Sequence, residues 1–175
     1  MLRFALVSAV LCAVMTVQAA DVSGQVAKLK DADPKVRQKA LAELGKMGPA
    51  AKSAIPAILE TLNDKTTWVT TKGLMALKDI GPDDSAAKAV MPHLAKFPDI
   101  RTLVVDVYVA MGEKATPHLI EALKDETTAE GACEALIQLG PKGKDAAKQL
   151  TEVSTKHKSK PVRDLAVKAL KAVNK

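Results

Sequence analysis

Four glycines at nearly regular intervals constrain the fold of this chain more than any other feature. Each follows a long apolar residue, and the positions four, seven and eight residues before each glycine hold apolar, aromatic or small side chains. These positions share one face of an α-helix. Glycine accepts the left-handed conformation that ends a helix, and proline follows three of the four. We therefore expect helices to end at Gly48, Gly81, Gly112 and Gly140.

A fifth copy of this pattern lies at the C-terminal end of the sequence. Asn174 stands where the glycine is expected, and asparagine is the usual substitute for glycine in the left-handed conformation. The corresponding apolar positions before it are Val162, Ala166, Val167, Leu170 and Val173. The pattern predicts a last helix over residues 161–173 that ends at Asn174.

A second apolar segment follows each glycine, and we call the two segments of a repeat the first and the second helix. Proline lies close to the expected start of three second helices, where its missing N–H costs little. The repeat is thus a helical hairpin of 28–34 residues, and a hairpin needs stacked neighbours to bury its apolar face. The chain is expected to be an all-α solenoid: a short helix over residues 22–29, four hairpins and the last helix. The prolines are Pro56, Pro92 and Pro117.

Several of these segments resemble a known repeat family. The sequences DPKVRQKALAELGKMG at 33–48, AIPAILETLND at 54–64, ATPHLIEALKD at 115–125 and KPVRDLAVKALKAV at 160–173 are similar to short HEAT repeats of the phycobilisome-lyase type. The resemblance covers residues 31–175 and is weaker where Thr70 and Ala129 replace an arginine. It implies a right-handed superhelix of about four and a half antiparallel hairpins, with the second helices lining a concave, protein-binding side.

The first residues are typical of a secretory signal peptide. Arg3 precedes an apolar stretch that is shorter than the ~20 residues needed to span a bilayer, and small residues then suit cleavage after Ala19. We expect a signal peptide over residues 1–19 and a repeat domain over residues 20–175, exported to the periplasm or the medium. Retention of the segment as an anchor is the alternative.

Charge is distributed unevenly along the expected mature chain. Residues 97–139 hold 3 basic and 8 acidic side chains, whereas residues 140–175 hold 10 basic and 3 acidic ones. A basic end can bind nucleic acid, but aromatic residues make up 2% of the chain, so platforms for stacking bases are absent. Together with export, this favours a protein partner, no nucleic acid, no membrane span after cleavage, and a monomer.

No recognised catalytic motif is present. The sequence lacks a glycine-rich phosphate loop, a nucleophile elbow and a Cys/His metal cluster. Cys133 occupies the repeat position that Leu41 and Leu74 hold in other copies, so we expect a small buried hydrophobic residue. The expectation is a protein that is not an enzyme and has no cofactor or bound metal.

Candidate contacts with a partner lie in two columns of the second helices. His93, His118 and Gln149 are equivalent in successive repeats, and Lys96, Glu121 and Glu152 form the column beside them. Trp68 occupies a position that is polar or charged in three of the other copies, so it is a candidate for an exposed contact residue. Its alternative role is to cover the seam between two hairpins.

The sequence therefore predicts an exported, non-catalytic HEAT-repeat scaffold that binds a protein through the groove of the second helices. One alternative is an accessory subunit of an extracytoplasmic enzyme or redox complex. Another is a metal carrier that uses His93 and His118, since two histidines and Glu121 would suit Zn²⁺ or Cu²⁺. Lys96 beside them argues against a bound cation.

Overall fold

The structure, a computed structural model, describes residues 21–96 and 98–175. These residues form helices and contain no strand, which confirms the all-α prediction. The expected signal peptide, residues 1–19, and Ala20 lie outside the described residues. Within the described part, no helix is both long and apolar enough to cross a bilayer. The chain divides into two compact units, which meet in sequence at Ile80 and Gly81.

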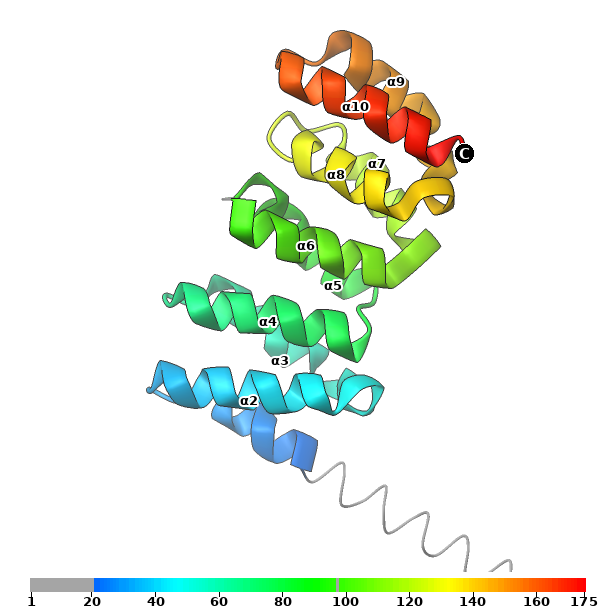
Figure 1. Cartoon of the computed structure of the whole chain (residues 1–175). Coiled ribbons are helices and arrows are strands. Elements are labelled where there is room, and N and C mark those ends of the chain that lie inside the picture. Colours follow the sequence, from blue (N-terminus) through cyan, green and yellow to red (C-terminus); the bar gives the residue numbers. More distant parts are fainter. Residues whose placement is uncertain (1–20, 97) are drawn as a thin grey trace, which may run out of the picture. The chain divides into compact units, whose positions relative to one another are not determined.

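The first unit contains two first helices and the second-helix segments that precede them. Its described part starts with helical residues at 21–28, which overlap the helix expected over 22–29. In Figure 1 the two first helices, α2 and α4, lie side by side. The elements are α2 (Pro34–Lys46), the 3₁₀ helix η1 (Gly48–Ala54), α3 (Ile55–Glu60), the 3₁₀ helix η2 (Thr61–Asn63) and α4 (Thr67–Ile80).

The second unit repeats this arrangement. Its first helices α6, α8 and α10 follow one another as neighbours (Figure 1), and each pair is separated in sequence by a second-helix segment. The elements are α5 (Asp84–Val90), η3 (Met91–Ala95), α6 (Pro98–Met111), η4 (Gly112–Ala115), α7 (Thr116–Ala122), α8 (Ala129–Leu139), η5 (Gly140–Ala146), α9 (Ala147–Lys156) and α10 (Lys160–Val173). This is the stacking of helical hairpins predicted for an α-solenoid. The hand of its superhelix stays a prediction.

The core consists of the apolar positions that recur in each repeat. The residues four positions before the glycines are Leu44, Leu77, Tyr108 and Leu136, and all four are fully buried. Burying a large apolar side chain stabilises a fold by about 1.5–3 kcal/mol. Tyr108 has the one polar side-chain group among these four residues, and its hydroxyl donates a hydrogen bond to the Ala87 carbonyl at 2.8 Å, so the buried group has a partner. The periodicity that predicted the helices therefore also predicts the core.

All four helix-stop glycines adopt the predicted left-handed conformation. Their φ angles are +55°, +91°, +63° and +56° in chain order, and no other described residue has a positive φ. Three of them lead directly into a 3₁₀ helix. After Gly81 the chain instead begins α5 with a capping residue: the Asp83 carboxylate accepts hydrogen bonds from the Ala86 N–H and the Ser85 hydroxyl.

Two details of the predicted pattern differ in the structure. Asn174 has φ −98° and is not left-handed, and its N–H continues the helical pattern by bonding to the Leu170 carbonyl. The right-handed region avoids the steric cost that a Cβ meets in the left-handed one. The second helices also begin or end as 3₁₀ segments, where the helix is tighter than the α-helix that was expected.

The glycine stops can be tested by two alanine substitutions of opposite expected sign. Gly112 has φ +63°, and a Cβ there would meet no other atom within 4 Å, so Gly112→Ala isolates the conformational cost. We expect a loss of about 1–2 kcal/mol in the free energy of unfolding. Gly24 lies in open space in the helix at residues 21–28, so Gly24→Ala should gain about 0.5–1 kcal/mol. Urea unfolding followed by circular dichroism measures both; equal effects would contradict the assignment.

Candidate functional site

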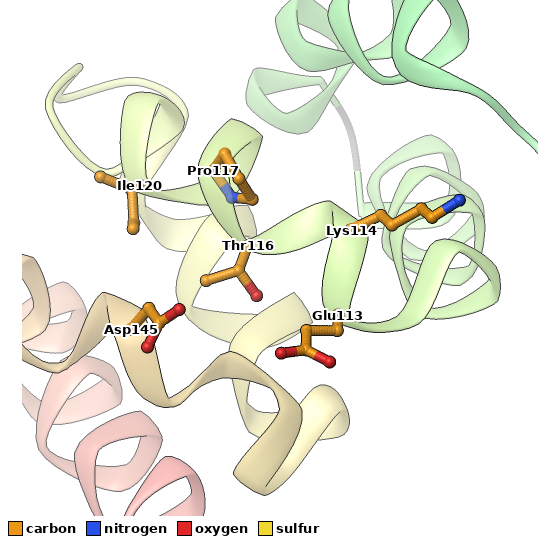
Figure 2. Close-up of a pocket in the computed structure, with 6 residues that line it drawn as sticks. All are labelled: Glu113, Lys114, Thr116, Pro117, Ile120 and Asp145. Carbon is orange, nitrogen blue, oxygen red and sulfur yellow. The ribbon is translucent and has the colours of Figure 1, made fainter.

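A depression of about 390 Å³ lies in the second unit where two successive second helices begin. It is formed by the end of η4, the first turns of α7 and one residue of η5. Figure 2 shows the residues that line it. They are Glu113, Lys114, Thr116, Pro117, Ile120 and Asp145. We call this depression the second-helix cleft.

The walls of the second-helix cleft are held by one buried hydrogen bond and one proline. The Thr116 side chain is buried, and its hydroxyl donates to the Lys142 carbonyl at 3.1 Å, which ties α7 to η5. Pro117 occupies the first turn of α7, as predicted, where its missing N–H would have no helical partner. Pro117 and Ile120 together supply the apolar part of the wall.

Two carboxylates give the second-helix cleft its charge. In Figure 2 the side chains of Asp145 and Glu113 lie on either side of Thr116, and the Lys114 side chain extends away from them. Neither carboxylate makes a side-chain hydrogen bond or ion pair with any described residue. An acidic end beside an apolar wall matches a lysine or arginine side chain, which has an apolar stem and a cationic head.

His118 lies in α7 beside the cleft residue Pro117, but its ring faces α5. Its Nε2 is 3.4 Å from Oδ1 of Asp84, and its side chain is 13% exposed. His118 therefore keeps one edge at the surface while Asp84 positions the ring. This contact places a predicted partner-binding residue next to the second-helix cleft.

His93 does not lie where the sequence analysis placed it. Its side chain is 4% exposed, so it cannot line an open groove. The expectation assumed a continuous second helix, whereas Met91–Ala95 is a short 3₁₀ segment that ends two residues later. The Nδ1 atom of His93 has no hydrogen-bond partner within the described chain. Burial lowers the pKa of His93, and the nearby charge of Lys96 lowers it further.

The other predicted contact residues are at the surface in differing degrees. Lys96 is exposed and Gln149 is half-buried. Glu121 pairs with Lys124 at 2.6 Å, and Glu152 pairs with Lys156 at 3.5 Å. These are exposed pairs within single helical segments, which contribute little stability and leave the carboxylates accessible.

Trp68 is 68% exposed at the start of α4, in the first unit. Its predicted exposure is therefore confirmed, and the alternative that it covers a seam is wrong. No side-chain hydrogen bond or ion pair joins any two of the seven predicted contact residues in residues 21–96 and 98–175.

Cys133 is a buried, free thiol, as its repeat position predicted. Burial raises its pKa to about 12, with smaller contributions from the charges of Glu134 and Glu130. A thiol with this pKa is not a nucleophile near neutral pH. Across the described residues, no group of three or more His, Cys, Asp or Glu side chains is placed to hold a metal ion. The metal-carrier alternative therefore lacks a ligand set there.

The sequence analysis missed the acidic residues of the second-helix cleft. Glu113 directly follows the Gly112 stop, and Asp145 lies five residues after the Gly140 stop, so they do not share a repeat position. The hairpin geometry brings them to one depression from different repeats. The acidic balance of residues 97–139 was the one signal in the sequence that pointed to this region.

The buried His93 predicts a pH-dependent stability. Because its pKa is lowered in the folded state, the folded chain binds a proton less readily than the unfolded chain does. The contribution of His93 to the free energy of unfolding should be fully present above the unfolded-state pKa of about 6.5. It should fall as the pH drops below that value, by at most about 1.4 kcal/mol per pH unit.

A comparison of wild type with His93→Leu by urea unfolding between pH 7.5 and pH 5 tests this dependence. The variant should lose the part of the slope that His93 contributes. His118→Gln is the matched control, because that ring is partly exposed and faces Asp84. Identical pH slopes for wild type and His93→Leu would contradict the prediction.

Similar folds occur among solved structures of helical repeat proteins. The complex of CpcE and CpcF of phycocyanin lyase from Nostoc sp. PCC7120 is 20% identical with a TM-score of 0.56, over 87% of this chain and 64% of that one. A designed armadillo repeat protein in complex with the peptide (KR)4 is 17% identical with a TM-score of 0.55, over 90% and 84%. An engineered protein is 17% identical with a TM-score of 0.53, over 90% and 81%.

These similarities establish the fold as an α-solenoid. No curated protein sequence matches the chain. A family model described as HEAT repeats matches residues 23–107. This stretch includes α2, α4 and most of α6. Residues 23–107 are therefore similar to the HEAT-repeat family.

Proposed function

We propose that this chain is an exported, non-catalytic scaffold that binds a protein partner through the second-helix cleft. Scaffolds of HEAT and armadillo repeats often bind proteins, and a rigid repeat surface loses little conformational entropy on binding. The observation that carries the proposal is the cleft itself: two exposed carboxylates without internal partners beside an apolar wall.

The chemistry of the cleft favours a basic segment as the bound element. Glu113 and Asp145 would pair with a lysine or arginine head group, and Pro117 and Ile120 would contact its apolar stem. The surrounding residues 97–139 are acidic, with 3 basic against 8 acidic side chains, so a basic segment would also be attracted from a distance. The structure of the similar designed armadillo repeat protein contains the peptide (KR)4, which supports a basic segment as the bound element.

Residues outside the cleft have supporting places in this proposal. His118, which lies beside Asp84, and the exposed Glu121 both belong to α7, the second helix that also carries Pro117 and Ile120. Gln149 and Glu152 lie on α9, the next second helix. Export rests on the signal-like residues 1–19, with cleavage after Ala19.

A direct test measures binding of a fluorescein-labelled (KR)4 peptide by anisotropy. The full sequence is expressed so that processing can occur, and the purified chain should have the mass of residues 20–175. We expect the double variant Glu113→Gln/Asp145→Asn to bind the peptide about fivefold more weakly than wild type, because two exposed charge pairs are lost. Affinity should fall with added salt.

The matched control is Glu126→Gln/Asp164→Asn, which removes the same charge from exposed carboxylates of the same unit that already pair with lysines and have no place in the proposed site. It should change the affinity by less than twofold. Equal weakening by both double variants would mean that the peptide responds to net charge alone. That result, or no binding at all, would contradict a role for the second-helix cleft in recognising basic segments.

A further inference from the structure

The first helices α2, α6 and α10 carry one stripe of residues that begins with an arginine, and this stripe is buried in α2 and α6 but partly exposed in α10. The stripe consists of three positions spaced i, i+4 and i+7, which lie on one helix face. In α2 it comprises Arg37, Leu41 and Leu44, and both leucines are fully buried. We call these three positions the outer stripe.

Arg37 shows how the next repeat covers the outer stripe of α2. Its Nε and an Nη donate to the two carboxylate oxygens of Asp64 at 2.7 and 2.8 Å, just before α4 begins. Its other Nη donates to the carbonyls of Asp31 and Ala32, which hold the guanidinium against its own loop. This bidentate pair is largely buried, with side chains 14% and 12% exposed.

The outer stripe of α6 is covered in the same way by α8. Arg101 pairs with Glu130 at 3.0 Å and with Glu134 at 3.2 Å. Val105 and Tyr108, the other two members, are buried. In both cases, therefore, carboxylates of the following repeat pair with the arginine, and the two apolar residues of the stripe are buried.

The outer stripe of α10 comprises Arg163, Val167 and Leu170, and it has no such cover. Val167 is 42% exposed, and Leu170 is partly exposed. The Arg163 Nη1 donates to the carbonyls of His157 at 2.6 Å and Lys158 at 2.9 Å. These carbonyls lie six and five residues before the arginine, as do those that Arg37 contacts. The Nε and Nη2 of Arg163 meet no acceptor in the described residues. The guanidinium is thus held in place with its carboxylate-binding edge open.

We propose that the outer stripe of α10 docks an acidic amphipathic helix of another protein. A carboxylate of that helix would pair with the open edge of Arg163, as Asp64 pairs with Arg37, and its apolar side would cover Val167 and Leu170. This surface is separate from the second-helix cleft and does not depend on the function proposed for the cleft.

Charge selects an acidic partner. Besides Arg163, α10 carries three lysines and a single carboxylate, Asp164, which pairs with Lys160 at 3.0 Å. An incoming helix with Asp or Glu residues would therefore meet a positive surface. The internal equivalents support this, since Asp64, Glu130 and Glu134 are the acidic groups that meet Arg37 and Arg101.

A second copy of this chain fits the stripe less well. Packing α10 on α10 of another copy would bring Arg163 and Lys171 together with like charges. Packing α2 of another copy there would require the close approach seen between α2 and α4. Ala76 of α4 comes within 3.4 Å of the Cβ position of Gly45, but Glu43 holds the place in α2 that Ala76 holds in α4.

The experiment uses a defined peptide that already has this chemistry. The synthetic peptide of residues 125–139 contains α8 with Glu130 and Glu134, the carboxylates that meet Arg101 in this protein, and it carries four acidic and no basic side chains. It is titrated into the ¹⁵N-labelled full chain, purified after processing, and followed by amide chemical shifts. We expect shifts centred on α10. The affinity should fall about tenfold or more in Val167→Glu, in Arg163→Gln, and with the Glu130→Gln/Glu134→Gln peptide.

Controls separate loss of docking from loss of folding. Arg163 also holds two loop carbonyls, so Val167→Glu is the decisive variant, because its side chain is already 42% exposed and is not required by the core. Unchanged thermal unfolding verifies that it folds. Lys156→Gln on α9 removes a positive charge that is 76% exposed away from the stripe, and it should bind as wild type does.

Three results would overturn the proposal. The first is the absence of shifts in α10. The second is binding that Val167→Glu and the Glu130→Gln/Glu134→Gln peptide leave unchanged. The third is self-association of the chain, measured by light scattering, that Val167→Glu abolishes, since the stripe would then serve a second copy.

Discussion

The structure depends on one constraint: a helical hairpin of this size cannot bury its own apolar face. The first helix of each repeat presents Leu41, Val105 or Cys133 outward, and these residues become buried because another repeat lies against them. Stability in such a protein therefore arises between repeats as much as within them. The left-handed glycines make this stacking possible, since they end each first helix at the same point and return the chain for the next hairpin.

Polar contacts follow the same repeat logic. Arg37, Arg101 and Arg163 share one repeat position, and each guanidinium is fixed by groups nearby. Arg37 and Arg101 bind carboxylates of the next repeat and so link the repeats, and Arg37 also holds the carbonyls of its own loop. The hydrogen bond from Arg37 holds the pKa of Asp64 below its usual range, which indicates that the folded state favours the charged carboxylate.

Most of the fold could be predicted from the sequence, because its determinants are local and periodic. The glycine stops, the buried stripe, the place of Cys133 and the exposure of Trp68 each follow from a position within the repeat. The hypotheses that failed depend on backbone detail that no periodicity reports. His93 is buried because its segment is a short 3₁₀ helix, and Asn174 stays right-handed because its Cβ makes the left-handed conformation costly.

The candidate site was harder to predict, since it joins residues that differ in repeat position. Glu113 and Asp145 meet at one depression although one directly follows its glycine and the other lies five residues beyond. The arginine contacts were partly visible in the sequence. The Val-Arg pairs at 36–37 and 162–163 were part of the family resemblance, but the carboxylates that bind Arg37 and Arg101 come from other repeats and required the structure.

The central claim is that a neighbouring repeat, and not the position within a repeat, decides which outer-stripe residues are covered. Cys133 and Val167 occupy the same repeat position, so the variant V167C places a second thiol at the uncovered end of the series. The measurement is the rate of iodoacetamide labelling of each thiol in the native chain, resolved by peptide mass spectrometry. The account predicts that the introduced thiol reacts like an exposed cysteine and that Cys133 reacts at least about a hundredfold more slowly. Equal rates for the two thiols would contradict it.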